Sequence, residues 1–150
     1  MTTWDSTVDV VIVGSGGGAM VAALTAADAG ASALVLEKQE RFGGSTAMSG
    51  GIVWVPDNPV MRSIGVPDSY EDAMVHFEAV VGDVGPASTF ERRHAFLTAG
   101  PEMVAFLQRQ GLRFSYCRGC SFSSQGPSAR PSKGTGSIPR PSSWPPLALE

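Results

Sequence analysis

Residues 10–19 constrain the fold of this chain more than any other stretch, because four branched apolar residues run directly into a glycine-rich turn. Val8 to Val13 predicts a buried strand, Gly14 to Gly18 a tight turn, and the alanine-rich stretch Gly17 to Ala29 a helix. A helix N-terminus leaves backbone N–H groups unpaired and carries a partial positive charge. Strand, turn and helix in this order therefore predict a binding site for a pyrophosphate.

The next acidic residue supports this interpretation. Gly30 stands where a helix ends, and Ser32 to Glu37 predicts a second strand that closes a βαβ unit of about 30 residues. Glu37 ends this strand, where a carboxylate can accept hydrogen bonds from an adenosine ribose. The basic residue that follows, Lys38, keeps open the alternative of a ribose 2′-phosphate. Ala19 takes the third glycine position of the G-x-G-x-x-G pattern, an accepted variant.

A second glycine-rich segment follows at Gly43–Gly51, here called the second glycine loop. Two glycine doublets surround three hydroxyl residues, so the backbone can approach a ligand closely while the hydroxyls donate hydrogen bonds. A simple NAD-binding domain has no need of such a loop. The alternative is an ordinary flexible Gly/Ser linker.

These motifs together resemble the flavoprotein family of fumarate reductase and succinate dehydrogenase. The resemblance lies in G-S-G-G-G-A at 14–19, Glu37-Lys38 and F-G-G-S-T-A-M-S-G-G at 42–51. Within that family the chain is most similar to the 3-ketosteroid Δ1-dehydrogenases. Two features indicate this branch: the run G-G-I-V-W-V-P-D-N-P at 50–59 and V-V-G-D at 80–83. The likeness covers roughly residues 8 to 119.

The resemblance implies that the cofactor is FAD. The residues expected to bind it are Gly14, Ser15, Gly16, Gly17, Gly18, Ala19, Glu37, Lys38, Gly43, Gly44, Ser45, Thr46, Ser49, Gly50 and Gly51. Gly14, Ser15, Gly16 and Ala19 would lie at the pyrophosphate and Glu37 at the ribose. Residues 44–46 and 49–51 would line the pyrophosphate and isoalloxazine side. That loop contains no histidine for covalent attachment, so we expect non-covalent FAD.

The resemblance also implies a chemistry and a class of substrate. In steroid dehydrogenases of this kind a hydride leaves the steroid ring for flavin N5, while a tyrosine takes the neighbouring proton. Tyr116 is near the first such tyrosine in sequence, but Cys120 stands closer to its expected position, so no catalytic residue is assigned. The family's partner is a small-molecule substrate, a steroid or an enoate. We therefore expect a fragment that does not turn over substrate by itself.

The middle of the chain predicts helices and one more strand. We expect a surface connection at Pro56–Asp68, helices opened by Ser69–Asp72, by Ser88–Glu91 and by Gly100-Pro101, and a strand at Leu112–Tyr116. His76 and His94 fall on the first two helices, and each is expected to be a packing or solvated histidine.

The character of the sequence changes after Gly119. Residues 121–150 contain six prolines and eight serines, so they offer few apolar side chains to offset the entropy of ordering. We expect residues 1–119 to be the N-terminal part of an FAD-binding domain, and 120–150 a disordered or out-of-frame tail. Cys117 and Cys120 have no two further ligands nearby, so no metal site is expected.

The fold class predicted is α/β: a Rossmann-like FAD-binding βαβ unit followed by helices, with an irregular Pro/Ser-rich C-terminal tail. A net charge of −3 gives no reason to expect nucleic acid as a partner. Residues 10–27 carry no charge, but three consecutive glycines argue against a membrane span, so cytoplasm is the default location. With few predicted strands, the isolated chain is expected to aggregate or to be molten. Two alternatives to a steroid dehydrogenase fragment are a fumarate reductase-like or 2-enoate reductase fragment and a non-catalytic nucleotide-binding remnant.

Overall fold

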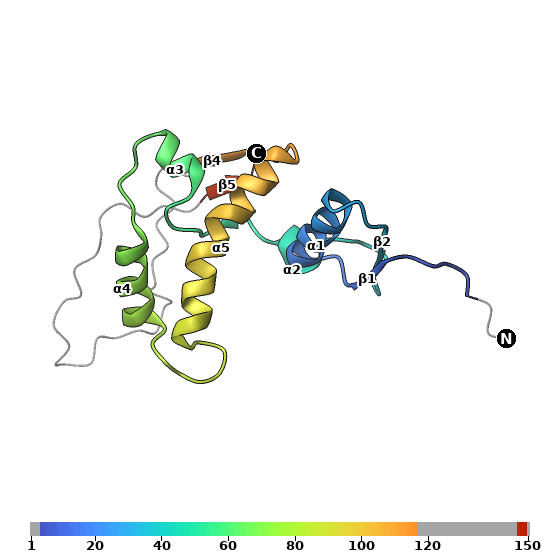
Figure 1. Cartoon of the computed structure of the whole chain (residues 1–150), viewed down its shortest axis with the longest axis horizontal. Coiled ribbons are helices and arrows are strands. Elements are labelled where there is room, and N and C mark those ends of the chain that lie inside the picture. Colours follow the sequence, from blue (N-terminus) through green and yellow to red (C-terminus); the bar gives the residue numbers. More distant parts are fainter. Residues whose placement is uncertain (1–3, 117–146, 150) are drawn as a thin grey trace. The chain divides into compact units, whose positions relative to one another are not determined.

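A computed structural model describes residues 4–116 and 147–149 of the chain, which divides into two compact units, Met1–Gly51 and Ile52–Glu150 (Figure 1). The first unit contains β1 (Val10–Val13), α1 (Gly17–Asp28), β2 (Ala33–Leu36) and α2 (Gly44–Met48). The second contains β3 (Ile52–Val53), α3 (Pro59–Ser63), α4 (Tyr70–Val80), α5 (Phe90–Arg109), β4 (Phe114–Tyr116) and β5 (Leu147–Leu149). The chain is thus a mixed α/β protein. Within the described residues no helix is long and apolar enough to cross a membrane.

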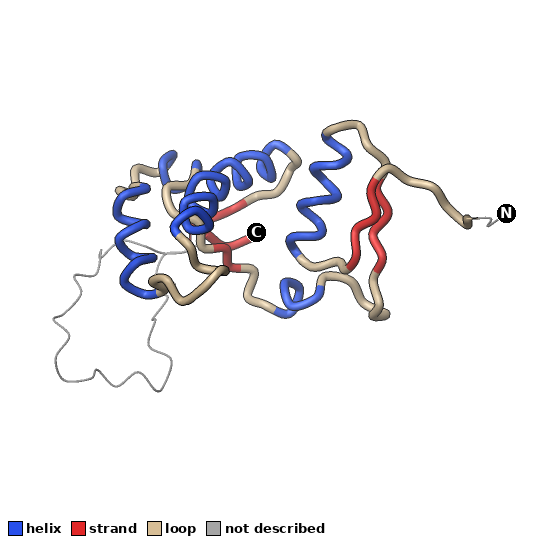
Figure 2. Tube along the Cα trace, turned by 60° about the horizontal axis from the view of Figure 1, so that its bottom comes forward, coloured by secondary structure: helices blue, strands red, loops and turns tan. Residues whose placement is uncertain are grey.

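The first unit is built on the predicted βαβ arrangement. Strands β1 and β2 pair in parallel, with Val10 opposite Ala33 and Val13 opposite Leu36. Figure 2 shows α1 running alongside these two strands. The register places Ile12 beside Val35 on one face of the sheet, where Ile12 is buried and Val35 half-buried. The predictions of strand, helix and parallel strand are therefore confirmed.

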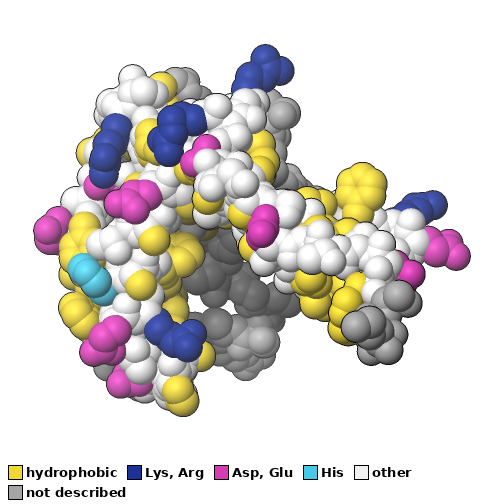
Figure 3. Space-filling model, turned by 45° about the vertical axis from the view of Figure 1, so that its right-hand side comes forward, with side chains coloured by type: hydrophobic (Ala, Val, Ile, Leu, Met, Phe, Trp, Pro, Cys, Tyr) yellow, Lys and Arg dark blue, Asp and Glu magenta, His cyan; other side chains and the backbone are white. Residues whose placement is uncertain are grey.

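The other face of this sheet is apolar and exposed. Side chains alternate between the two faces of a strand, so Val11 and Val13 share this face with Leu34 and Leu36. All four are exposed, Val13 to 85%; apolar side chains at the surface are visible in Figure 3. The sequence predicts a strand buried on both faces, and for β1 this is wrong. Within the described residues of this unit, no element covers the second face.

The second unit contains a small antiparallel sheet with strand order β3-β5-β4. Strand β4 corresponds to the strand predicted at Leu112–Tyr116. Strand β5 lies within the stretch whose sequence predicts an irregular tail, and its backbone pairs with both neighbours. The rest of that predicted tail lies outside the described residues, as do Cys117 and Cys120.

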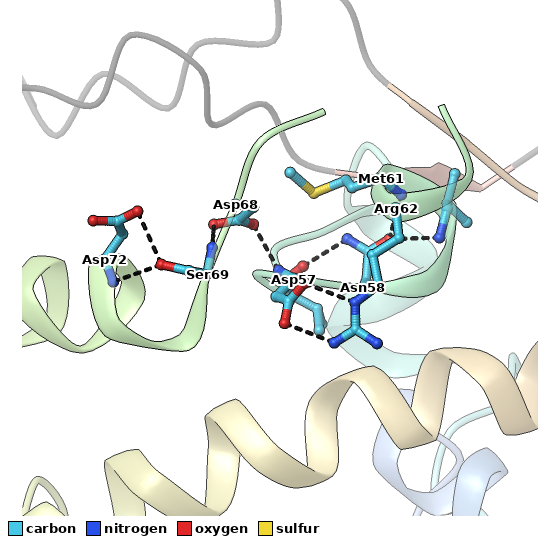
Figure 4. Close-up of polar contacts among 9 residues, drawn as sticks. Asp57, Asn58, Met61, Arg62, Asp68, Ser69 and Asp72 are labelled. Carbon is cyan, nitrogen blue, oxygen red and sulfur yellow. Dashed lines mark hydrogen bonds and ion pairs between the residues drawn. The ribbon is translucent and has the colours of Figure 1, made fainter. Parts of the chain in front are cut away.

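A short helix replaces part of the predicted surface connection at Pro56–Asp68. Asn58 is fully buried, and its Oδ1 accepts hydrogen bonds from the N–H groups of Val60 and Met61 at 3.0 and 3.1 Å (Figure 4). Pro59 occupies the first helical position, where its missing N–H is not needed. Asparagine as N-cap followed by proline thus begins α3. Met61 is buried too, so the prediction of a surface connection is wrong here.

Helix α4 begins as the sequence predicts. The Ser69 hydroxyl accepts a hydrogen bond from the N–H of Asp72 at 3.1 Å (Figure 4). Just before it, the Asp68 carboxylate accepts from the N–H groups of Asp57 and Ser69 at 2.6 and 2.9 Å. Asp57 also forms a two-pronged ion pair with Arg62. Burial raises the pKa of Asp68 despite its two N–H donors.

Helix α5 joins two helices that the sequence predicts to be separate. It runs unbroken from Phe90 to Arg109 with Pro101 in its interior, so the predicted start at Gly100-Pro101 is wrong. Its N-cap is Thr89, one residue after the predicted serine. Gly100 is buried beside Val55, and a Cβ added there would lie 3.0 Å from the Val55 Cγ1. This close packing favours a helix that continues past Gly100, although Pro101 locally favours a break.

The core of the second unit consists of two apolar clusters. In one, Val55 and Val104 are buried and pack with partly buried side chains of β3, α3, α5 and β4. In the other, Ala73, Met74 and Leu97 join α4 to α5.

Candidate cofactor site

The turn between β1 and α1 presents backbone donors of the kind that bind a phosphate. Gly14 adopts φ +92°, which favours glycine, and its N–H donates to the Leu36 carbonyl at 2.7 Å. This bond ties the turn to the end of β2. Among the described residues, the N–H groups of Gly18 and Ala19 in the first turn of α1 have no hydrogen-bond partner. Unpaired N–H groups at a helix start can bind an anion.

Ser15 links this turn to Glu37 and to the second glycine loop. Its N–H and its hydroxyl both donate to Glu37 Oε2, at 3.0 and 2.5 Å. Its Oγ in turn accepts a hydrogen bond from the N–H of Gly43 at 2.8 Å. Ser15 is buried, with 2% of its surface exposed. The sequence predicts Ser15 at the pyrophosphate and does not reveal its hydrogen bonds to Glu37 and Gly43. The only sequence features that could have indicated them are a hydroxyl residue beside the first glycine and an acidic residue at the end of the strand.

A second bond connects the two glycine-rich segments. The N–H of Gly17, at the start of α1, donates to the Thr46 Oγ1 at 3.0 Å. Gly43 adopts φ +106° and Gly44 adopts φ +52°. A Cβ added to Gly44 would lie 3.7 Å from the Gly16 Cα. After this left-handed turn the chain forms α2 rather than the open loop that the sequence predicts. Glycine at 43 permits the turn that begins this helix.

The other residues expected to bind the cofactor lie in the same unit with fewer contacts. The Ser49 hydroxyl donates to the Thr46 carbonyl at 2.8 Å and accepts from the N–H of Gly51 at 3.1 Å. Lys38, Ser45 and Gly50 are exposed. The structure thus brings Ser15, Glu37 and Gly43 together and Gly17 with Thr46. Their contacts with a cofactor stay predictions.

The Glu37 carboxylate is ionised more readily than an ordinary glutamate. The hydrogen bond from the Ser15 hydroxyl is the largest cause that lowers its pKa, followed by the Gln39 N–H, which donates to Oε1 at 2.9 Å. Both hydrogen bonds to Oε2 come from Ser15, and the Lys38 N–H also helps to lower the pKa of this carboxylate. The geometry is compatible with the predicted bond from a ribose hydroxyl.

The residues of this unit fit a dinucleotide. The unpaired N–H groups at the N-terminus of α1 suit the negative charge of a diphosphate, and the glycines of the turn leave room for it. The Glu37 carboxylate at the end of β2 is an acceptor for a ribose hydroxyl. The described residues contain no group of three or more His, Cys, Asp or Glu side chains placed to hold a metal ion.

The second unit contains a surface pocket with a paired histidine. Tyr70 and His94 lie on its wall together with Asp57 and Arg62, and the Tyr70 hydroxyl is 2.7 Å from the His94 Nδ1. His76 packs at 5.7 Å between ring centroids against Trp54. Both histidines thus have aromatic neighbours; His76 is half-buried and His94 is exposed.

Comparison with known proteins agrees with this geometry. Residues 9–144 match the family described as FAD binding domain. The chain is 46% identical over 114 residues to 3-oxosteroid 1-dehydrogenase of Mycolicibacterium smegmatis, a match that covers 75% of this chain and 20% of the relative. It is 50% identical over 64 residues to urocanate reductase of Eggerthella lenta, covering 43% and 11%.

A solved structure is also similar. It is 3-ketosteroid Δ1-dehydrogenase of Sterolibacterium denitrificans in complex with 1,4-androstadiene-3,17-dione, with a TM-score of 0.64 and 38% identity. That match covers 73% of this chain and 19% of the other. The chain thus spans about a fifth of the length of the relatives it matches. The βαβ unit and the glycine-rich turn agree with this similarity to 3-ketosteroid dehydrogenases, and FAD is indicated as the cofactor. The chain belongs to the FAD binding domain family.

Proposed function

We propose that residues 8–116 hold FAD without a covalent bond, as the cofactor-binding part of an oxidoreductase that desaturates 3-oxosteroids. The observation that carries this proposal is the first unit's geometry, in which the α1 N-terminus, Glu37 and the second glycine loop are joined by hydrogen bonds. In this proposal Gly18 and Ala19 donate to the pyrophosphate and Glu37 accepts from the ribose. When bound, FAD supplies the acceptor for a hydride.

Binding is tested by reconstituting the 150-residue chain with FAD and removing the excess by gel filtration. We expect flavin absorption bands near 370 and 450 nm, a property of the cofactor. Acid precipitation should release all the flavin into the supernatant if attachment is non-covalent. Protein that emerges from the column without flavin would contradict the proposal, and flavin that stays with the precipitate would contradict non-covalent binding.

The substrate class rests on the relatives. Similarity to a 3-oxosteroid 1-dehydrogenase and to a 3-ketosteroid Δ1-dehydrogenase supports a steroid, and the 3-keto group is what both names share. A chimera tests it: residues 8–116 replace the matching segment of the Mycolicibacterium smegmatis relative. We expect the chimera to bind FAD and to retain steroid 1-dehydrogenation. A chimera that binds FAD normally but does not oxidise the steroid would count against this use of the cofactor.

We also propose that the 150-residue chain alone does not oxidise a steroid. No described residue is assigned as the base that takes the proton, and the match to the Mycolicibacterium smegmatis relative covers 20% of that protein. The FAD-loaded chain, mixed anaerobically with a 3-oxosteroid, should keep its 450 nm band. Bleaching of that band would show that the chain suffices for the reaction.

The similarity to urocanate reductase favours one alternative, a reductase that adds hydride to an enoate. The same replacement in that relative discriminates between them. Retained urocanate reduction together with lost steroid oxidation would favour the reductase. The reverse result would favour the dehydrogenase.

A further inference from the structure

Both hydrogen-bond donors of Ser15, its hydroxyl and its backbone N–H, are used within the protein. Its hydroxyl has one proton, which goes to Glu37 Oε2, and its oxygen accepts from the N–H of Gly43. Its backbone N–H is also bonded to Glu37 Oε2. With both donors in use and the residue buried, Ser15 faces the protein and not a ligand.

The three groups form one hydrogen-bond chain with a charge at its end. The Gly43 N–H donates to the serine oxygen, and the serine proton donates to the carboxylate. Hydrogen bonds to a charged group are the stronger ones, and bonds in a chain polarise one another. A carboxylate at this point therefore makes the Ser15 oxygen a better acceptor for Gly43. The charge of Glu37 thereby reaches a backbone group six residues further along the chain.

Gly43 is the residue at which the second glycine loop takes its shape. It is the left-handed N-cap of α2, and a Cβ there would lie 2.5 Å from the Ala47 Cβ. Fixing its N–H fixes where α2 begins. That start brings the Thr46 hydroxyl to the Gly17 N–H, so two bonds hold the second glycine loop to the phosphate turn.

We propose that Ser15 and Glu37 are positioning residues that order the second glycine loop before the cofactor binds. The proposal rests on the proposed function in one respect, namely that this loop contacts FAD. Glu37 then has two roles: its Oε2 orders the loop through Ser15, and in the proposed function its carboxylate accepts a hydrogen bond from the ribose. An ordered loop lowers the entropy that binding must otherwise remove.

The same unit contains a matched control at the opposite ends of the two strands. The Ser32 N–H and hydroxyl both donate to Asp9 Oδ2, at 2.8 and 2.6 Å, and the Asp9 N–H donates to the Ser32 Oγ at 3.0 Å. This serine–carboxylate pair has the same chemistry and also joins β1 to β2, but it has no bond to the second glycine loop. Ser32→Ala therefore reports the general cost of losing such a pair.

The experiment measures amide hydrogen exchange by NMR on the full chain without FAD. The exchange ratio of Gly44 to Gly43 is the readout, because the Gly44 N–H has no partner among the described residues and both amides share the intrinsic pH dependence of exchange. We expect Gly43 to exchange at least about tenfold more slowly in the wild type. Ser15→Ala should remove this difference, whereas Ser32→Ala should leave it unchanged.

Glu37→Gln separates the charge from the packing. In the wild type the ratio should fall as the pH drops through the lowered pKa of Glu37, whose causes are hydrogen bonds and burial and include no neighbouring side-chain charge. In Glu37→Gln the ratio should be lower and should show no such step. Asp9 titrates in the same acidic range because its pKa is lowered by Ser32, so the step must persist in Ser32→Ala.

FAD titration of the same proteins distinguishes the two proposals. We expect Ser15→Ala to raise the Kd for FAD about tenfold more than Ser32→Ala. If the wild type shows the exchange pattern but binds no FAD, the proposed function fails and the positioning role stands. If the Gly43 N–H is unprotected in the wild type, or if Ser32→Ala changes it as much as Ser15→Ala, the positioning role is overturned.

Discussion

The glycine at 43 gives the sharpest prediction about the second glycine loop. In Gly43→Ala the new Cβ would lie 2.5 Å from the Ala47 Cβ, in a backbone conformation of φ +106° that L-residues rarely adopt. Ala47 is rigidly placed one turn further along α2, so the backbone at 43 must move instead. That movement breaks the bond between the Gly43 N–H and the Ser15 Oγ.

The magnitude follows from the two sources of strain. A left-handed conformation costs an L-residue about 1–2 kcal/mol, and an inserted methyl without space costs about 1–3 kcal/mol. Together they oppose the ordered loop by about 2–5 kcal/mol. Because 1.4 kcal/mol corresponds to about a factor of ten in affinity, we expect FAD binding to weaken by at least about 30-fold.

Gly30→Ala is the matched control. Gly30 also has a left-handed backbone, φ +74°, but nothing lies within 4 Å of an added Cβ, and it follows the far end of α1. Gly30→Ala should lower the free energy of unfolding by about 1–2 kcal/mol without changing FAD affinity. The assay is quenching of flavin fluorescence on titration of FAD with each variant. Equal affinities of the two variants for FAD would refute the argument that α2 must begin at Gly43.

Three further predictions concern stability, measured by chemical denaturation followed by circular dichroism. Asn58→Ala removes a buried cap and leaves two N–H groups unpaired, so the free energy of unfolding should fall by about 1–3 kcal/mol; an unchanged value would show that water replaces the cap. Pro101→Ala restores an N–H within α5 and should raise the free energy of unfolding by up to about 3 kcal/mol; a decrease would show that packing of the proline ring outweighs the restored hydrogen bond. Asp9 and Glu37 have lowered pKa values, so their stabilisation is complete above the unfolded-state values and is lost as the pH falls through the folded-state ones. As the pH falls below about 4.5, the free energy of unfolding of the first unit should therefore decrease progressively, and an equal decrease in Ser15→Ala and Ser32→Ala would contradict this.

Local patterns in the sequence were enough to predict the order of strand, helix and parallel strand in the first unit. Four branched residues, a glycine turn and an alanine-rich stretch each favour one conformation, whatever lies elsewhere in the chain. Glu37 could be placed at the end of β2 because the apolar run that forms this strand stops there. Ser69 before α4 was predictable for the same reason, since an N-cap acts within one turn of helix.

Only the tertiary structure decided the partners of these residues. Glu37 and Gly43 lie 22 and 28 positions after Ser15 in the chain, and no periodicity of the sequence relates them to it. The same holds for α5, where proline argues locally for a break but packing of Gly100 against Val55 favours one helix. It also holds for β5, whose few apolar residues form a strand through backbone pairing with β3 and β4. The periodicity of a sequence indicates which face of a helix or strand is apolar. Which distant group forms a hydrogen bond with a given hydroxyl or N–H depends on the tertiary fold, because the fold brings distant segments together.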